Sequence, residues 1–393
     1  MQDAKFERIE EGKALPGTCC GERADGFPFP VFGEEPCSCG ERRGSPKSDP
    51  GPLTTRVGEV VRVSSEWSWA DSWGMVKSRV GAFRMNYAIP PGLYAFGEPT
   101  KESDVLVTAN YKLTFDTLRR SLKGLQAWIL VLETRGINVW CAAGKGTFGT
   151  DELVRRISET KLDQLVNHRR IILPQLGAVG VNSNRVQEKT GFRVFFGPVE
   201  AREIQAYIDR GYKKTREMST IKFSMRDRLI LTPMEINPAL KRYAWLAAGM
   251  FLFFGLEPSG FLFKPAWSYG FPFVLLGLIA LLAGAFVAPL LLPFLPFRSF
   301  ALKGWGAGIL AVAFGVQFLG IPEKYDGLTV IAAYIFFPVL SSYLALQFTG
   351  STTFTSMSGV KRELKIGIPI YLGAAGISLV LIAAAKLKEW GIV

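Results

Sequence analysis

Histidine is almost absent from this 393-residue chain, which contains only His168. A zinc site with several histidine ligands cannot be built from one histidine, and neither can the paired histidines of a metalloprotease helix. A Ser-His-Asp triad could use no histidine other than this one. His168 lies in the run Asn167-His168-Arg169-Arg170, just before an apolar segment. A surface or helix-end position therefore explains it better than a catalytic one.

Cysteine is also scarce, and four of the five residues, Cys19, Cys20, Cys37 and Cys39, lie near the start of the chain. The charged opening stretch lacks the apolar core of a signal peptide, so we expect the N-terminal part to stay in the cytoplasm. In that reducing compartment the cysteines should be free thiols or metal ligands and not disulfides. The spacing of these four cysteines fits neither a ferredoxin cluster nor a zinc finger. Two interpretations stay open: an arm that captures a soft metal, or a tail whose thiols have no required role.

Acidic residues are outnumbered, because 46 Lys and Arg against 34 Asp and Glu give a net charge of +12. A basic balance is typical of proteins that bind nucleic acid, but here the basic residues flank long apolar runs. That arrangement indicates membrane orientation. Because no nucleic-acid-binding motif is present either, we expect no nucleic-acid partner.

The N-terminal region divides into an arm and a folded part. Residues 1–52 are rich in Gly, Pro, Glu and Arg and show little periodicity, which predicts a disordered arm that carries both cysteine pairs. Residues 53–236 are expected to form a cytoplasmic α/β domain. Its first segment contains Trp67, Trp69 and Trp73, and we expect it to pack on the part that follows.

Short apolar segments alternate with segments of helical spacing from residue 104 to about residue 211. Strands are expected at 105–107, 127–132, 170–173 and 192–196, and helices at 115–122, 151–157 (with Thr150 as N-cap), 182–189 and 199–210. Continuous apolar strands between helices indicate a parallel sheet that is covered on both faces. The sequence therefore predicts a doubly wound, Rossmann-like α/β domain, whose ligands bind at the carboxyl ends of the strands.

Charged residues are nearly absent from five long stretches in the last part of the chain. These stretches are 243–262, 271–296, 302–321, 328–349 and 366–385. Each approaches the ~20 residues that cross a bilayer. We therefore expect residues 237–393 to form an all-α bundle with five transmembrane helices in the cytoplasmic membrane. The lack of charges within the stretches favours an anchor over a transporter.

The charges that flank these stretches predict an orientation. Basic residues lie before the first stretch, between the second and third, and between the fourth and fifth: Lys241, Arg242, Arg298, Lys303, Lys361, Arg362 and Lys365. The positive-inside rule then places the α/β domain in the cytoplasm and the C-terminus outside. Lys386 and Lys388, on the outer side, argue mildly against this orientation.

The most informative run extends from Gly136 to Gly146 and directly follows the strand expected at 127–132. Its Gly-Lys pair suggests a phosphate loop, but a Walker A loop needs glycine at position 139 and Ser or Thr at position 146. Val139 and Gly146 occupy those positions, which excludes this motif.

A short helix over residues 138–145 would place Asn138, Cys141 and Lys145 on one face, with Ala142 beside them. Trp140 and Ala143 would then point toward packing. A cysteine in the first turn has its thiolate stabilised by the helix dipole and by a nearby lysine. These residues alone are compatible with a ligand-facing thiolate and equally with a buried, inert cysteine.

The run Asn138-Val139-Trp140-Cys141-Ala142-Ala143-Gly144-Lys145 resembles the signature of the corrinoid protein of the bacterial and archaeal mercury-methylation pair, the HgcA family. The run from Val107 to Lys112, and the order of a soluble domain before five spans, also resemble that family. The similarity covers roughly residues 85–390. The soluble domain is also similar to the corrinoid iron–sulfur protein of acetyl-CoA synthesis, which lacks a membrane bundle.

The resemblance implies a cobalamin-type corrinoid with cobalt as cofactor. It implies that Cys141 is the catalytic residue and the axial ligand to cobalt, since the Asp-x-His-x-x-Gly motif of other corrinoid proteins is missing. The remaining contacts that it suggests are Asn138, Val139, Trp140, Ala142, Ala143, Gly144, Lys145, Thr108 and Asn110. The glycine runs 177–180 and 197–198 follow expected strands and are weaker candidates, because glycines also simply make turns.

The implied activity is that of a corrinoid-dependent methyltransferase, which passes a methyl group from cobalt to mercuric ion and forms methylmercury. The methyl donor would belong to the folate one-carbon pathway, and a ferredoxin-like protein with two 4Fe–4S clusters (HgcB type) would supply electrons. An alternative is a membrane-anchored corrinoid methyl carrier for another acceptor in one-carbon metabolism. A membrane scaffold or transporter with an incidental α/β domain is a third hypothesis.

Overall fold

The computed structural model describes residues 51–348 and 357–392. The expected N-terminal arm, with its two cysteine pairs, lies almost wholly outside the described residues.

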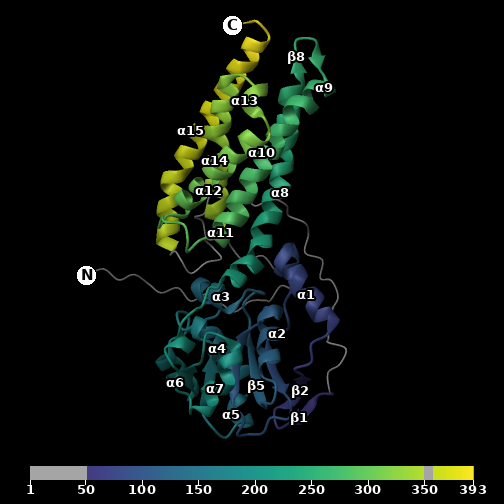
Figure 1. Ribbon diagram of the computed structural model, residues 1–393. Helices are drawn as coiled ribbons and strands as arrows, with labels where there is room; N and C mark the ends of the chain where they lie inside the picture. Colours follow the sequence, from purple (N-terminus) through teal and green to yellow (C-terminus); the bar gives the residue numbers. More distant parts are fainter. Residues whose placement is uncertain (1–50, 349–356, 393) are drawn as a thin grey trace, which may run out of the picture. The chain divides into compact units, whose positions relative to one another are not determined.

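Seven strands form one mixed sheet in the order β1-β2-β3-β5-β4-β6-β7 (Figure 1). The strands are β1 (Leu53–Thr55), β2 (Gly58–Val63), β3 (Gly92–Phe96), β4 (Val105–Ala109), β5 (Ala127–Leu132), β6 (Arg170–Leu173) and β7 (Arg193–Phe196). Strands β4 to β7 are parallel, so the predicted parallel arrangement is confirmed for them. Strand β3 runs antiparallel to β5, and β1 runs antiparallel to β2.

Residues 53–100, for which the sequence pattern predicted no strand or helix, add three strands and a helix to this domain. In β2, exposed Glu59 and Val61 alternate with buried Val60 and Val63. Such a half-buried strand lacks the continuous apolar run of the buried strands. The sequence pattern therefore predicts β4 to β7 and does not reveal β1 to β3.

Helices cover both faces of the sheet. They are α1 (Trp69–Val80), α2 (Lys112–Ser121), α3 (Val139–Lys145), α4 (Thr150–Glu159), α5 (Leu162–Leu165), α6 (Ser183–Thr190) and α7 (Ile204–Asp209). Residues of α3, α4, α5 and α6 share one hydrophobic core with the sheet. Residues of α2 and α7 share the other. The α4 N-cap is Gly149 and not Thr150, which is the first helical residue.

Apolar helices make up the rest of the described chain. The longer ones are α8 (Met225–Gly255), α10 (Phe271–Leu282), α12 (Phe300–Phe318), α14 (Gly327–Gln347) and α15 (Met357–Glu389). Short helices are α9 (Phe263–Pro265), α11 (Ala288–Leu290) and α13 (Ile321–Lys324). Strands β8 (Leu256–Glu257) and β9 (Gly260–Phe261) form a two-stranded hairpin.

Four segments of the described chain are long and apolar enough to cross a membrane, where five were expected. They are Phe263–Leu290, Phe300–Phe318, Gly327–Gln347 and Ser358–Glu389. The expected first span, 243–262, is interrupted because α8 ends at Gly255 and the β8–β9 hairpin follows. Pro258 and Gly260 explain this turn, with Gly260 at φ +116°. The predicted orientation across the membrane stays a prediction.

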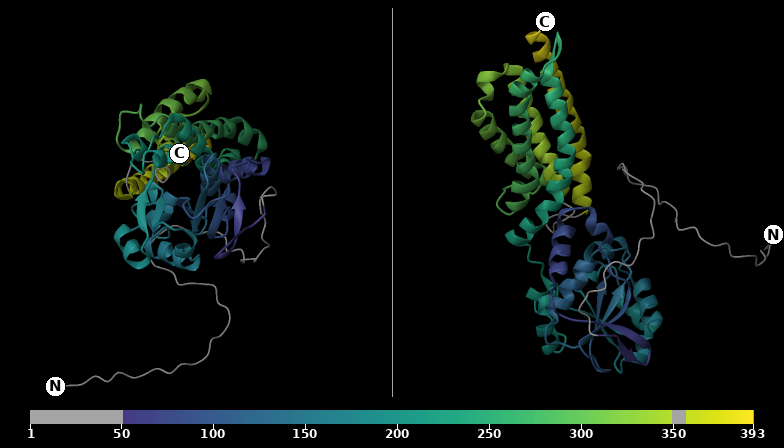
Figure 2. Two further views of the ribbon diagram at one scale, coloured as in Figure 1. Left: turned by 90° about the horizontal axis from the view of Figure 1, so that it is seen from below. Right: turned by 90° about the vertical axis from the view of Figure 1, so that its right-hand side faces the viewer.

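The apolar helices lie side by side (Figure 2), and they approach one another closely where glycine lacks a side chain. A Cβ atom on Gly304 of α12 would lie 2.4 Å from Cβ of Ala345 in α14. A Cβ atom on Gly308 would lie 2.6 Å from Cβ of Ser341. Close contact between small residues is the usual way for helices to associate in lipid, where no hydrophobic force drives them together.

Candidate functional site

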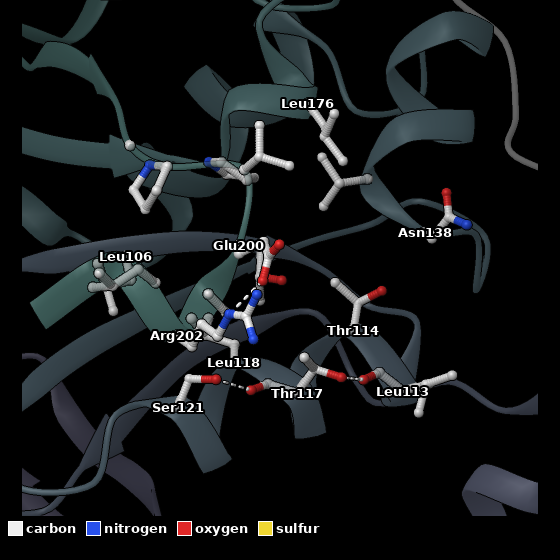
Figure 3. Close-up of a pocket in the computed structure, with 18 of the residues that line it drawn as sticks. Leu106, Leu113, Thr114, Thr117, Leu118, Ser121, Asn138, Leu176, Glu200 and Arg202 are labelled. Carbon is white, nitrogen blue, oxygen red and sulfur yellow. Dashed lines mark hydrogen bonds and ion pairs between the residues drawn. The ribbon is translucent and has the colours of Figure 1, made fainter. Parts of the chain in front are cut away.

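A cavity of about 910 Å³ lies at the carboxyl ends of β4 and β6 (Figure 3). The chain continues from β4 to β5 on one side, and later returns to place β6 on the other side of β4. Strand β4 pairs with β5 along its whole length, whereas its pairing with β6 is confined to Leu106 and Ile172. This is the switch point at which open α/β sheets bind their ligands.

The cavity wall is mainly apolar with a few hydroxyl groups. Leu106 and Thr108 of β4 contribute to the wall, and so do Pro174 and Leu176 after β6. Helix α2 supplies Thr114, Thr117 and Ser121, which Figure 3 shows along one side of the cavity. The Thr117 hydroxyl donates to the Leu113 carbonyl (2.7 Å), and Ser121 donates to the Thr117 carbonyl (2.8 Å). Their oxygens can still accept hydrogen bonds from a ligand.

Helix α3 begins at the rim of this cavity, and the prediction of a short helix at 138–145 is confirmed. Asn138 is the N-cap, and its side-chain oxygen accepts from the backbone N–H of Cys141 (2.9 Å). Gly146 ends the helix with φ +80°, a conformation that glycine adopts without strain. The cap fixes where the first turn lies, and therefore where Cys141 lies.

The predicted faces of α3 need two corrections. Ala142, expected beside the ligand, is fully buried in the core with Val139 and Ala143. Trp140, expected to pack, is 38% exposed and lines the cavity. The reason is the apolar spacing of Val139, Ala142 and Ala143, three and four residues apart, which turns that side toward the sheet.

Three predicted contacts of α3, Asn138, Val139 and Trp140, line the cavity. Cys141 is the next residue, but it is not among the residues that line the cavity, and its free thiol is half-buried. Gly144 and Lys145 are exposed farther along the helix. The structure thus brings the start of the predicted motif to the cavity, and places its last residues away from the wall.

The two predicted residues at the end of β4 differ in role. Thr108 is buried and lines the cavity. Asn110 does not line it, because its side chain is used inside the protein. Its amide nitrogen donates to Glu133 (2.9 Å), and its oxygen accepts from the backbone N–H groups of Thr134 (3.1 Å) and Gly136 (2.9 Å). Asn110 therefore holds the loop that leads into α3, and we correct its expected role as a cofactor contact.

Glu152 of α4 holds the other side of the same loop, and the sequence search missed it. Its carboxylate accepts from the backbone N–H of Glu133 (2.8 Å) and from Arg156 (2.9 Å). Burial alone would raise the pKa of Glu152, but these hydrogen bonds and one from Arg155 outweigh burial and lower it. The carboxylate therefore stays ionised and keeps the loop in place.

The glycines after β6 pack against α3. A Cβ atom on Gly180 would lie 2.2 Å from the Phe148 carbonyl oxygen and 3.1 Å from Cα of Ala143. A Cβ atom on Gly177 would lie 2.5 Å from the Phe148 ring. These two glycines allow close packing, whereas Gly197 and Pro198 do line the cavity.

The described residues around the cavity form no cluster of metal ligands, although the Glu200 carboxylate lies in its wall. Within residues 51–348 and 357–392, no group of three or more His, Cys, Asp or Glu residues could hold a metal ion. His168 bonds to backbone groups, with its ring nitrogens 3.0 Å from the Ser103 carbonyl and 3.2 Å from the Arg170 N–H. The described residues near the cavity therefore offer a metal isolated donors, the Cys141 thiol and the Glu200 carboxylate, and no complete set of ligands.

Known proteins resemble the α/β part of the chain. A family described as the CO dehydrogenase/acetyl-CoA synthase delta subunit (CdhD) matches residues 84–208. A gamma subunit of the acetyl-CoA decarbonylase/synthase complex from Archaeoglobus fulgidus is 31% identical over 126 residues, which are 32% of this chain and 26% of the relative. The gamma subunit from Methanothermobacter thermautotrophicus is 33% identical over 163 residues, 40% of this chain and 35% of the relative.

The likeness is thus confined to part of each protein. The chain spans about a quarter to a third of the length of these relatives, and the four apolar segments lie outside the residues that the family matches. The matched residues include β4, the cavity wall at its carboxyl end, and helix α3. The functional comparison therefore concerns the α/β domain and its cavity.

Proposed function

We propose that this protein is a membrane-anchored corrinoid protein that carries a methyl group, with Cys141 as the protein ligand to cobalt. The observation that carries the proposal is the cavity at the switch point, whose wall includes Asn138, Val139 and Trp140 from the start of α3, directly before Cys141. The resemblance of the α/β domain to acetyl-CoA decarbonylase/synthase subunits supports a corrinoid protein. The four apolar segments support a membrane anchor.

The residues at the cavity fit a corrinoid. A volume of about 910 Å³ is near the upper end of the range for small-molecule and cofactor sites. A corrinoid would bring most of the ligands of its own cobalt, so the chain would need to add a single donor. Cys141 is the free cysteine of the described chain and is half-buried. The hydroxyl groups of α2 can accept hydrogen bonds from the amides at the ring edge.

A bound corrinoid would supply a cobalt centre that accepts and releases a methyl group. The chain's own residues hold the thiolate in position. Asn138 caps α3, Val139 and Ala143 anchor the helix to the core, and Lys145 keeps a cation one turn from Cys141. Trp140 and Thr108 shape the wall and restrict water.

The methyl acceptor is the narrower part of the proposal. The resemblance to acetyl-CoA decarbonylase/synthase subunits favours a carrier within one-carbon metabolism. The run from Asn138 to Lys145 resembles the mercury-methylating family and favours transfer to mercuric ion, a soft electrophile. In that form the donor is a folate-linked methyl group, and the electrons come from a ferredoxin-like partner with two 4Fe–4S clusters.

The test uses the purified full chain, kept anaerobic and reconstituted with methylcobalamin. We expect a bound corrinoid whose absorption spectrum changes in Cys141→Ala, because the axial donor is lost. Cys141→His should restore a ligated spectrum, since imidazole also binds cobalt. The matched control replaces Cys19, Cys20, Cys37 and Cys39 with serine and should keep the spectrum of the unchanged chain. Protein that stays colourless after reconstitution would contradict the proposal.

The acceptor is decided in the same preparation by adding mercuric ion or a thiol acceptor. Methylmercury that falls at least about tenfold in Cys141→Ala supports the mercury reaction. Loss of the methyl group to the thiol alone supports the general carrier. Methylmercury formation that is unchanged in Cys141→Ala would show that Cys141 is not the ligand through which transfer proceeds.

A further inference from the structure

Helix α1 and the 3₁₀ turn after it, Ala82–Asn86, present large apolar side chains to the outside. Trp69 is 80% exposed, Trp73 is 50% exposed, and Met85 is 66% exposed. Val76, Val80 and Phe83 are exposed as well. Positions 69, 73, 76 and 80 are three or four residues apart, so they form one stripe along α1. We call these six residues the α1 stripe.

The charges beside the α1 stripe are positive. The Lys77 ammonium lies 5.4 Å from the Trp73 ring centre and 5.8 Å from that of Phe83, and Arg84 is exposed. The one acidic residue of the segment, Asp71, is buried and paired with Lys112 (3.0 Å) and Arg119 (2.7 Å). The outward side of this segment is therefore apolar and basic.

A contiguous exposed apolar surface of this kind marks an interaction site. Tryptophan and basic residues together are typical of helices that lie in the boundary between lipid headgroups and acyl chains. The same chain also carries four segments able to cross a membrane. The side chain of Asn237, in α8, donates to the carbonyl of Val80 at the end of α1 (2.7 Å). The stripe is thus joined directly to the helix that precedes those segments.

We propose that α1 lies in the headgroup layer of an anionic membrane, with the α1 stripe toward the acyl chains and with Lys77 and Arg84 on lipid phosphates. This inference rests on the membrane anchoring in the proposed function and extends it to the α/β domain. The other side of α1 contributes Met75 and Arg79 to the cavity wall. One helix therefore forms both the lipid contact and part of the cofactor site.

The experiment places the full chain in phosphatidylcholine vesicles, with or without phosphatidylglycerol, that contain a phosphatidylglycerol analogue with a diazirine near its headgroup. After illumination, adducts are mapped by peptide mass spectrometry. A second analogue, with the diazirine in its acyl chain, gives the membrane reference on α15, where Leu379 is 65% exposed. The peptide that contains α6 gives the water reference.

We expect headgroup adducts on residues 69–85 and background yield on α6. Lys77→Gln with Arg84→Gln should lower the α1 yield roughly fivefold for each charge removed. The matched control, Arg185→Gln with Lys189→Gln on α6, should leave it unchanged. Trp69→Gln with Trp73→Gln should also lower it, because the apolar contact is lost.

The references separate the two proposals. Adducts on α15 together with background yield on residues 69–85 would overturn the lipid contact alone, and would assign the α1 stripe to a protein partner. The absence of acyl-chain adducts on α15 would overturn the membrane anchoring itself. If the yield of headgroup adducts on α1 is the same in Lys77→Gln with Arg84→Gln as in the α6 control variant, the role of Lys77 and Arg84 is refuted.

Discussion

Asn110 is buried at the carboxyl end of β4, where its side chain bonds to Glu133, Thr134 and Gly136. These residues form the loop that carries the chain from β5 to α3. The loop decides where α3 begins, so Asn110 acts on Cys141 at a distance. It is a positioning residue of the proposed site and not a contact.

Asn110→Ala removes the acceptor of two backbone N–H groups. Each group left without a partner costs about 1–3 kcal/mol, so we expect a clear drop in the free energy of unfolding. Corrinoid affinity should fall roughly tenfold, as is usual when a residue that orients a ligand is removed. Thermal denaturation and titration with methylcobalamin measure the two effects.

Asn182→Ala is the matched control for this change. Asn182 caps α6 by accepting from the backbone N–H of Arg185 (3.1 Å), and it is not among the residues that line the cavity. Loss of this cap should lower the free energy of unfolding by about 1 kcal/mol and leave the corrinoid affinity unchanged. Equal affinity losses in the two variants would refute the positioning role of Asn110.

The residues of α3 show what spacing could predict. Helical geometry correctly placed Asn138 and Lys145 on one side, away from the core. It misjudged Ala142 because relative angles do not tell which direction faces the sheet. The apolar repeat of Val139, Ala142 and Ala143 carried that information. The roles of Asn110 and Glu152 depend on hydrogen bonds between segments far apart in the sequence, which no local pattern reveals.

At the scale of elements, a buried ion-pair network joins α1 to α2. Asp71 of α1 bonds to Lys112 and Arg119 of α2, and both also bond to Asp116. Arg119 donates as well to the carbonyl groups of Ser64 and Glu66. Both helices contribute to the cavity wall, so the network fixes the distance between two of its sides.

Asp71→Asn should lower the free energy of unfolding by about 3–5 kcal/mol at neutral pH, because Asp116 alone then faces the two cations Lys112 and Arg119 and one buried positive charge is left uncompensated. Burial alone would raise the pKa of Asp71, but hydrogen bonds from Ser68, Lys112 and Arg119 outweigh burial and hold it well below its ordinary value. A lowered pKa means that the stabilisation is present above about pH 4 and is lost as the pH falls further.

The measurement is the thermal midpoint between neutral and strongly acidic pH. The unchanged chain should show a plateau above about pH 4 and a decline below it, and Asp71→Asn should flatten that decline. Asp163→Asn is the control, because Asp163 is exposed and its change should alter neither plateau nor slope appreciably. A full decline that persists in Asp71→Asn would contradict the assignment.

Whole elements were predictable where burial makes their pattern continuous. The central strands β4 and β5 are buried at every position and almost wholly apolar, and α6 begins and ends at recognisable caps, Asn182 and Gly191. Strands β1 to β3 were not predictable, because they lie toward the edge of the sheet and are only partly buried. Trp69 and Trp73 were expected to pack on the domain, but they are exposed.

At the scale of the whole molecule, the α/β domain and the apolar helices have separate hydrophobic cores. Two cores lie on the two faces of the sheet, and the others lie among α8, α10, α12, α14 and α15. Hydropathy predicted the apolar part and its lengths well. It overcounted the spans because an average over the window does not register the turn at Pro258.

Gly308→Val tests the independence of these cores. The added side chain would meet Ser341 and the backbone of Pro338 (3.0 Å to its Cα), and overpacking of this kind costs about 1–3 kcal/mol. We expect a lower thermal midpoint in detergent and an unchanged corrinoid spectrum.

Gly306→Val is the control, because its Cβ would come no closer than 3.5 Å to a neighbour, Phe297. It should leave both the midpoint and the spectrum in place. Loss of bound corrinoid in Gly308→Val, but not in Gly306→Val, would show that the two parts of the chain are coupled.

In the proposed arrangement, the two sides of α1 would give the molecule a thermodynamic property of its own. A ligand that shifts Met75 or Arg79 would also shift the helix that carries Trp69 and Trp73, and the free energies of filling the cavity and of contacting lipid would then be linked. Linkage is reciprocal: if the cofactor strengthens adhesion to anionic lipid by some factor, anionic lipid strengthens retention of the cofactor by the same factor. The lipid composition of the bilayer would then act as an effector of cofactor loading.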